Sequence, residues 1–162
     1  MNPGGCLFSL IAGRGEAPLA ALLTGLEDSA SDWNIFVACD LPLLNGCFID
    51  LFLRRVQQAD FDAVVARTDG GWQPLCAAYR RTCIPKMLEL LGKQRSGIID
   101  VLPELRVNVI SPAQLAALGL GEDIFTNVNT PEDWQKILQR MRDHRGQCLL
   151  VSHLHSQLLR FD

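Results

Sequence analysis

The sequence predicts a single α/β domain with a mostly parallel sheet that carries helices on both faces. Short apolar runs alternate along the chain with amphipathic stretches, as in sheets whose strands are connected through helices. No stretch rich in glycine, serine or proline divides the 162 residues, a length typical of one domain. Hydrophobic residues make up 48% and charged residues 20%, a composition that excludes a disordered chain.

The first half of the chain predicts three strands and two helices. Residues 6–12, 34–39 and 62–67 form the strands, and the middle run is largely apolar, as in a strand buried on both faces of a parallel sheet. Helices are expected over residues 18–27, with a proline in the first turn, and over 49–58, where apolar residues recur at helical spacing.

The second half continues the alternation. An Asp-Gly-Gly turn at residues 69–71 precedes a further extended segment, 75–79. The remaining elements expected, in chain order, are helices 84–91 and 96–102, strand 107–110, helix 113–118, strand 124–128 and a last helix to about residue 142. Thr130 is the expected N-cap of that last helix, and Pro131 takes its first position.

Charge and cysteine spacing exclude several classes of protein. The formal net charge of −3 does not favour nucleic acid or an anionic membrane surface as the main partner. No apolar stretch reaches the roughly 18 residues of a membrane span, and the start of the chain lacks the basic head of a secretory signal. The six cysteines include no C-x-x-C pair, so we expect free thiols in a cytoplasmic protein.

The segment Ala38-Cys39-Asp40-Leu41-Pro42 is the most informative motif. It places a carboxylate just after a buried strand, where open α/β sheets bind ligands. A carboxylate in this position is a natural ligand for Mg²⁺, which prefers one or two carboxylates together with phosphate oxygens and water. The alternative, an aspartate that merely caps the next segment, fits the spacing equally well.

Two further segments carry polar groups to strand ends. Gln73 and Pro74 follow Trp72 at the mouth of an expected strand, and an indole beside an amide is suited to a heterocyclic ligand. Asn127 and Asn129 flank the end of the expected strand 124–128, beside a helix N-terminus. Ordinary loop, turn and cap roles are the alternatives. We expect these four residues to meet Asp40 in one cleft at the carboxyl ends of the strands.

Four segments in order resemble the molybdenum cofactor guanylyltransferase family, from about residue 15 to about residue 142. The first is the helix start Pro-Leu-Ala at 18–20, with Leu-Thr-Gly-Leu at 23–26. The others are WNIFVACDLP at 33–42, DAVVARTDGGWQPLCAAYR at 62–80 and NVNTPE at 127–132. Each is weak alone, but the four in this order are specific.

The resemblance implies a three-layer Rossmann-like nucleotidyltransferase fold and an enzyme that transfers GMP from Mg-GTP to molybdopterin, releasing pyrophosphate. Asp40 falls on the family's magnesium- and GTP-binding aspartate, and is the expected catalytic residue. Gln73, Pro74, Asn127 and Asn129 are the expected cofactor- or substrate-binding residues. Mg²⁺ is the implied cofactor, GTP and molybdopterin are the substrates, and molybdoenzyme maturation proteins are the implied partners.

The chain also departs from the family pattern. The family opens with a strand and a loop of the form Leu-x-Gly-Gly-x-Ser-x-Arg-Met-Gly-x-Asp-Lys, which has no counterpart here, and Ala17 and Ala21 replace two glycines. We therefore expect an N-terminally truncated nucleotidyltransferase-like domain over residues 1–143, missing the first strand–loop unit, and a tail of unclear structure over 144–162. The alternatives are a non-catalytic cofactor- or nucleotide-binding module and a transferase for a different nucleotide. We expect the 162 residues alone not to turn over Mg-GTP.

Overall fold

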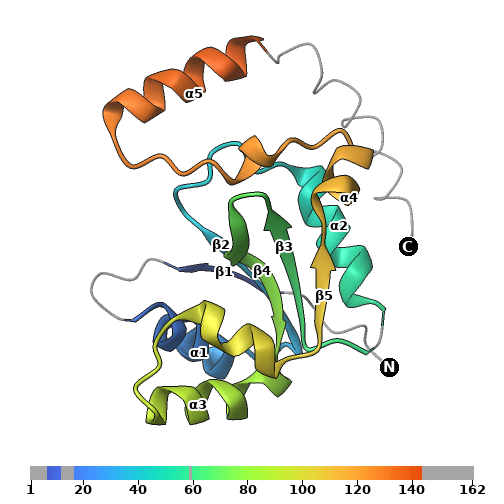
Figure 1. The fold of residues 1–162 in the computed structure, drawn as a ribbon, viewed down its shortest axis with the longest axis vertical. Coiled ribbons are helices and arrows are strands. Elements are labelled where there is room, and N and C mark those ends of the chain that lie inside the picture. Colours follow the sequence, from blue (N-terminus) through green and yellow to red (C-terminus); the bar gives the residue numbers. More distant parts are fainter. Residues whose placement is uncertain (1–6, 12–16, 59, 144–162) are drawn as a thin grey trace.

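The computed structural model of the protein describes residues 7–11, 17–58 and 60–143 (Figure 1). The expected tail at 144–162 lies outside the described residues, as do both ends of the strand expected at 6–12. None of the helices in the described ranges combines the length and the apolar character needed to cross a membrane.

Five strands form one sheet in the order β1-β2-β4-β3-β5. They are β1 (Leu7–Ile11), β2 (Trp33–Ala38), β3 (Ala63–Thr68), β4 (Gly71–Arg80) and β5 (Val107–Ile110). β1 pairs with β2 and β3 with β5 in parallel, whereas β4 runs antiparallel to both of its neighbours. Four strands therefore point the same way. This confirms the predicted mostly parallel sheet, and the segment 75–79 lies in its antiparallel strand, β4.

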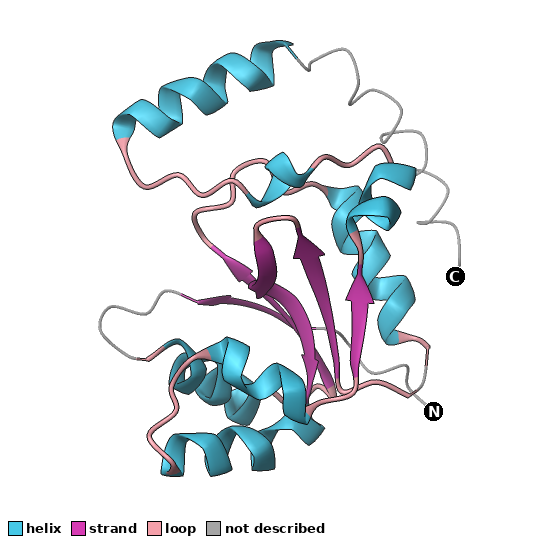
Figure 2. Cartoon of the chain, in the orientation of Figure 1, coloured by secondary structure: helices cyan, strands magenta, loops and turns pink. Residues whose placement is uncertain are grey.

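Helices cover both faces of the sheet, which confirms the three-layer α/β class (Figure 2). One core lies beneath α1 (Pro18–Asp28), α3 (Ile84–Gly92) and the 3₁₀ helix η2 (Ile98–Glu104). The other lies beneath α2 (Gly46–Val56), α4 (Pro112–Ala117) and the 3₁₀ helix η3 (Glu122–Phe125). A short 3₁₀ turn, η1 (Arg81–Cys83), joins β4 to α3, and α5 (Pro131–Asp143) ends the described chain.

Local sequence explains most helix starts. Pro18 opens α1, and Leu19, Leu22 and Leu26 recur at helical spacing and are fully buried. As predicted, Thr130 caps α5, because its Oγ1 accepts a hydrogen bond from the Asp133 amide at 3.1 Å. α2 begins at Gly46, three residues before the predicted start, because Asn45 caps it through a 3.2 Å hydrogen bond from the Phe48 amide.

The strand predicted over residues 124–128 is wrong. The structure forms η3 there and continues as a loop to residue 130. Ile124 and Phe125 are buried, but they pack with the α2 core and do not join the sheet, and the Thr126 amide bonds locally to the Asp123 carbonyl at 2.9 Å. A short apolar run does not distinguish a strand from a buried helical turn. The edge position next to β3 is taken by β5.

A charged cluster fastens β5 to β3 at the edge opposite the strands' carboxyl ends. The Asp62 carboxylate accepts hydrogen bonds from the Arg106 amide and Nε, both at 3.1 Å, and from Arg106 Nη2 and Thr82 Oγ1, also at 3.1 Å. The Asp62 side chain is 15% exposed. These donors, the Arg106 side chain above all, hold the pKa of Asp62 below its ordinary value.

Asp62→Asn is expected to lower the urea midpoint at pH 7, because the variant loses charged hydrogen bonds across the sheet. A depressed pKa in the folded state means that the ionised form contributes stability above the unfolded pKa of about 3.9, and that this contribution is lost as the pH falls further. The difference between the two midpoints should therefore shrink below about pH 4. A difference that stays constant from pH 7 to pH 3 would contradict this account of Asp62.

Candidate functional site

Asp40 lies two residues beyond the end of β2, at the edge where β2, β3 and β5 end. We call this edge the carboxyl edge. The Asp40 carbonyl accepts a hydrogen bond from the Val128 amide at 2.9 Å. Its side-chain Oδ1 is buried and has no hydrogen-bond partner among the described residues. Because Val128 stands between Asn127 and Asn129, the structure brings the aspartate together with the segment that holds both asparagines.

Asn127 and Asn129 are both exposed. Within the part of the chain that the structure describes, neither side-chain amide makes a hydrogen bond to a protein side chain or backbone group. The cap of α5 is Thr130, so helix capping does not account for either asparagine. Two amides therefore face solvent beside Asp40, each able to donate and accept hydrogen bonds.

Gln73 and Pro74 lie near the start of β4, at the same edge. The β2–β4 register ends at the pair Val37–Cys76, so Gln73 and Pro74 lie past the last paired residues of β4, in the direction in which β2 leads to Asp40. Gln73 Nε2 donates to Thr68 Oγ1 at 3.1 Å, and Thr68 Oγ1 donates to the Gly71 carbonyl at 3.1 Å. Among the described residues, no hydrogen bond joins Gln73 to Asp40, so the structure places Gln73 at the edge but holds its amide nitrogen against β3.

A bulge in β4 surrounds Pro74. Val65 pairs with Ala77 and Arg67 with Trp72, so one residue of β3 faces the four residues 73–76 of β4. A bulge suits proline, which has no N–H to give to a neighbouring strand. The Pro74 carbonyl is satisfied from within the core, because the Tyr79 hydroxyl donates to it at 2.8 Å. Burial raises the pKa of Tyr79, so this hydroxyl stays protonated and serves as a donor.

Tyr79→Phe should lower the free energy of unfolding by about 1–2 kcal/mol, because the Pro74 carbonyl would lose its buried donor. The phenylalanine ring keeps the edge-to-face contact with Phe36, whose centroid lies 6.0 Å away. Urea unfolding of both proteins measures the difference in free energy, provided that the dependence of that free energy on urea concentration has the same slope in both. A loss below about 0.5 kcal/mol would show that the hydroxyl does not support the bulge.

The segment 122–130 is fastened at three points. Glu122 Oε1 accepts a hydrogen bond from the Asp69 amide at the β3–β4 turn, at 2.9 Å. Phe125 packs edge-on against Phe48 of α2, with ring centroids 5.1 Å apart. The third point is the bond between Val128 and Asp40. This segment thus crosses the carboxyl edge and holds the asparagines in place (Figure 2).

Sequence reasoning missed Thr68, Tyr79 and Glu122 as supports of the site. Tyr79 alone had a signal: it is the only tyrosine of the chain and ends an apolar run, and a buried tyrosine usually needs a partner for its hydroxyl. Thr68 and Glu122 act across the fold and carry no local signal.

The donor set is compatible with Mg²⁺. Across the described residues, no group of three or more His, Cys, Asp or Glu side chains gathers around one point, and Cys39, Cys47, Cys76 and Cys83 are free. Mg²⁺ needs only one or two carboxylates when phosphate oxygens supply further ligands. The Asp40 carboxylate supplies oxygen of the type that Mg²⁺ binds, and its buried Oδ1 accepts no hydrogen bond from the described residues.

Comparison with known proteins gives consistent matches. The family model described as "MobA-like NTP transferase domain" matches residues 3–107. A probable molybdenum cofactor guanylyltransferase of Carboxydothermus hydrogenoformans is 34% identical over 125 residues, which are 77% of this chain and 62% of the relative. A protein of the same description from Bacillus mycoides is 33% identical over 121 residues, 75% of this chain and 58% of the relative. The chain thus spans about three-fifths of the length of these curated relatives.

Solved structures show the same fold. The molybdopterin-guanine dinucleotide biosynthesis protein A of Archaeoglobus fulgidus superposes with a TM-score of 0.66 at 20% identity, covering 77% of this chain and 64% of that one. A protein of Aquifex aeolicus VF5 superposes with a TM-score of 0.55 at 22% identity, covering 70% and 57%. At these identities the likeness concerns the fold alone.

Proposed function

Because the chain belongs to the family of MobA-like NTP transferase domains, we propose that its site transfers GMP from Mg-GTP to molybdopterin. The products are pyrophosphate and molybdopterin guanine dinucleotide. The proposal rests on the hydrogen bond between the Asp40 carbonyl and the Val128 amide. This bond brings two exposed side-chain amides next to a carboxylate whose buried Oδ1 has no partner among the described residues. The two relatives reported above are both described as probable molybdenum cofactor guanylyltransferases, which supports the choice of substrates.

The reaction is a displacement at phosphorus. An oxygen of the terminal phosphate of molybdopterin forms a bond to the α-phosphorus of GTP, and the bond from the α-phosphorus to the bridging oxygen of pyrophosphate breaks. The attacking oxygen is already ionised, so no proton has to be removed by the protein. Positioning and charge compensation are therefore the main tasks of the side chains.

Each residue of the site has a role under this proposal. Asp40 holds the metal ion, and bound Mg²⁺ supplies neutralisation of the charge on the triphosphate and the departing pyrophosphate. Asn127 and Asn129 orient the acceptor through hydrogen bonds from their amides. Gln73 and Pro74 line the site from the start of β4, and the hydrogen bond to Thr68 keeps the Gln73 side chain in one orientation.

The second candidate is a binding module without catalysis, or a transferase for another nucleotide. The observation that favours it is the presence of Ala17 and Ala21 where the family carries glycines, since a Cβ keeps the backbone farther from a ligand.

Pyrophosphate release tests these proposals. The assay combines GTP, Mg²⁺ and molybdopterin with one of three proteins. These are the 162-residue chain, a chimera that adds the family's opening strand and glycine-rich loop to it, and the Carboxydothermus relative as positive control. Release by the chimera that needs all three components supports guanylyl transfer, and a preference for ATP or CTP supports another nucleotide. Saturable GTP binding by the chimera without release of pyrophosphate supports the binding module. The chain alone tests the expectation that it does not turn over Mg-GTP.

A further inference from the structure

We propose that Arg67 binds a phosphate group of a substrate held at Asp40. The inference rests on the proposed function and assigns one more binding residue to the same site. Bound Mg²⁺ compensates only part of the charge of a triphosphate, and sites of phosphoryl transfer use fixed lysine or arginine side chains for the remainder. A guanidinium recognises the phosphate oxygens of either the nucleotide or the acceptor.

The sheet places Arg67 at the carboxyl edge. Ala77 of β4 pairs both with Phe36 of β2 and with Val65 of β3, so Phe36 and Val65 are level in the sheet. β2 and β3 point the same way, because both run antiparallel to β4. The bulge lies in β4 and does not interrupt β3. Two residues farther along, Arg67 is therefore level with Ala38, the last residue of β2.

Arg67 is within reach of a ligand at Asp40. Val65 lies in the core under α1 and α3, and side chains alternate along a strand, so Arg67 projects from that same face. Ala38 and Arg67 stand two strands apart, which is about 10 Å. Asp40 follows Ala38 by two residues, which adds about 7 Å along the chain. A triphosphate and the long arginine side chain together can span this separation.

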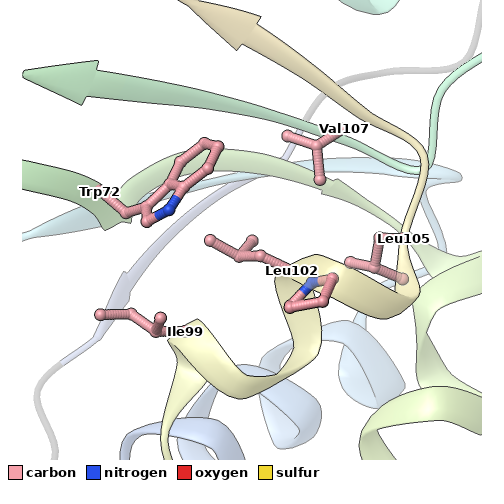
Figure 3. Close-up of a pocket in the computed structure, with 6 residues that line it drawn as sticks. Trp72, Ile99, Leu102, Leu105 and Val107 are labelled. Carbon is pink, nitrogen blue, oxygen red and sulfur yellow. The ribbon is translucent and has the colours of Figure 1, made fainter.

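Trp72 holds the guanidinium of Arg67 in place. The two residues are cross-strand partners, and the guanidinium carbon lies 5.4 Å from the centroid of the indole ring. The indole is half-buried, packs against the core, and lines an apolar hollow together with Leu102 and Val107 (Figure 3). A guanidinium stacked on an aromatic face keeps the N–H groups at its edge free. The stack therefore fixes the cation without using its hydrogen-bond donors.

No carboxylate in the part of the chain that the structure describes forms an ion pair with Arg67, although Asp69 lies only two residues away. The Arg67 side chain is exposed. The other basic residue of the described strands is Arg80, which ends β4 at the opposite edge and is paired with Asp32 at 2.7 Å. Arg67 is thus the strand cation that is available to an anionic ligand at the carboxyl edge.

The test titrates the full chain with inorganic triphosphate and Mg²⁺ and measures binding by calorimetry. Arg67→Gln should weaken binding about tenfold, the order of one lost hydrogen bond to a charged group. Arg67→Lys should recover part of the affinity, because it keeps the charge but not the planar fork of donors. Arg54→Gln is the matched control, since it removes the same charge from an exposed residue in the last turn of α2 and should change nothing.

Trp72→Leu tests the positioning role of the indole. Loss of the stack should weaken triphosphate binding about two- to fivefold, the range for an exposed cation–π pair, while Trp72→Phe retains most of it. In the Arg67→Gln background, Trp72→Leu should have no further effect, because the cation that it positions is already absent. A loss of equal size in both backgrounds would contradict the positioning role.

The outcomes separate this inference from the proposed function. Weaker triphosphate binding in Arg67→Gln, but not in Arg54→Gln, supports the proposal and assigns Arg67 to the nucleotide. Weaker binding of molybdopterin in the same variant assigns it to the acceptor. Unchanged affinity for both probes in Arg67→Gln, or absence of saturable binding of both to the unmodified chain, would overturn the proposal.

Titrations in EDTA separate Arg67 from the metal role of Asp40. The effect of Arg67→Gln should persist without Mg²⁺, because the guanidinium contacts the phosphate itself, whereas the effect of Asp40→Asn should disappear. None of these titrations requires transfer. An intact Arg67 effect together with absent pyrophosphate release would therefore refute guanylyl transfer alone.

Discussion

Asp40→Asn is expected to weaken Mg²⁺-dependent binding of GTP by about 100-fold or more, because loss of an outer partner of a metal site alone costs about 10–100-fold. The substitution keeps the shape of the side chain and one oxygen, but it removes the negative charge that attracts the ion. The Asp40 carbonyl is unchanged, so the bond from the Val128 amide remains and the fold should be intact. Calorimetric titration of GTP with Mg²⁺ and with EDTA measures the metal-dependent part.

Asp69→Asn is the matched control, since it removes the same charge from an exposed position in the β3–β4 turn at the same edge. A general electrostatic effect would change both variants alike, whereas metal coordination would change only Asp40→Asn. Equal metal dependence in the unmodified protein and in Asp40→Asn would remove Asp40 from the metal role.

Phe48→Ala should lower the free energy of unfolding by about 3–5 kcal/mol, the range for truncation of a buried aromatic side chain. Phe48 is fully buried, and its ring centroid lies 4.6 Å from that of Phe52 and 5.1 Å from that of Phe125, both edge-on. It therefore joins α2 to η3, and its loss should also loosen the segment that carries Asn127 and Asn129.

Urea unfolding measures the first effect, and hydrogen exchange of the Val128 amide measures the second. Phe52→Ala is the matched control, because Phe52 is also fully buried on α2 and contacts Phe48, while no aromatic contact links it to Phe125 among the described residues. Both variants should be destabilised, but faster exchange at Val128 relative to the global unfolding rate is expected for Phe48→Ala. The same local protection in the two variants would contradict the role of Phe48 as the link.

Elements with strong local signals could be predicted from the sequence. Residues 34–39 are largely apolar and end at an aspartate followed by Pro42, and β2 spans nearly the same residues. Thr130 and Pro131 correctly predicted the start of α5, because helix capping depends only on residues close in the sequence. The prediction of a strand over residues 124–128 was wrong because Ile124 and Phe125 are buried against α2 and not by pairing in the sheet. Tertiary contacts of that kind produce no periodic pattern of apolar residues in the sequence.

The candidate site, too, could be predicted from the sequence only where the signal is local. The position of Asp40 follows from one motif, since a residue just past a parallel strand must lie at the carboxyl edge. Its bond to Val128 and the bond of Glu122 to Asp69 join residues 88 and 53 positions apart, and neither pair is recognisable without the fold. The bulge at Pro74 depends on Tyr79 in the core, which likewise cannot be predicted from the spacing of apolar residues.

Under the proposed function, Asp40 holds a metal-bound nucleotide next to the 127–129 segment, whose asparagines orient the acceptor. The most direct measurement is nuclear magnetic resonance with Mn²⁺-GTP, because paramagnetic Mn²⁺ broadens the signals of nearby amides and takes the oxygen ligands that Mg²⁺ takes. We expect broadening of the amide signals of Asn127, Val128, Asn129 and Gln73 in the unmodified protein, and its loss in Asp40→Asn. Broadening centred instead on the carboxylates Asp60 and Asp62, at the opposite edge of the sheet, would contradict it.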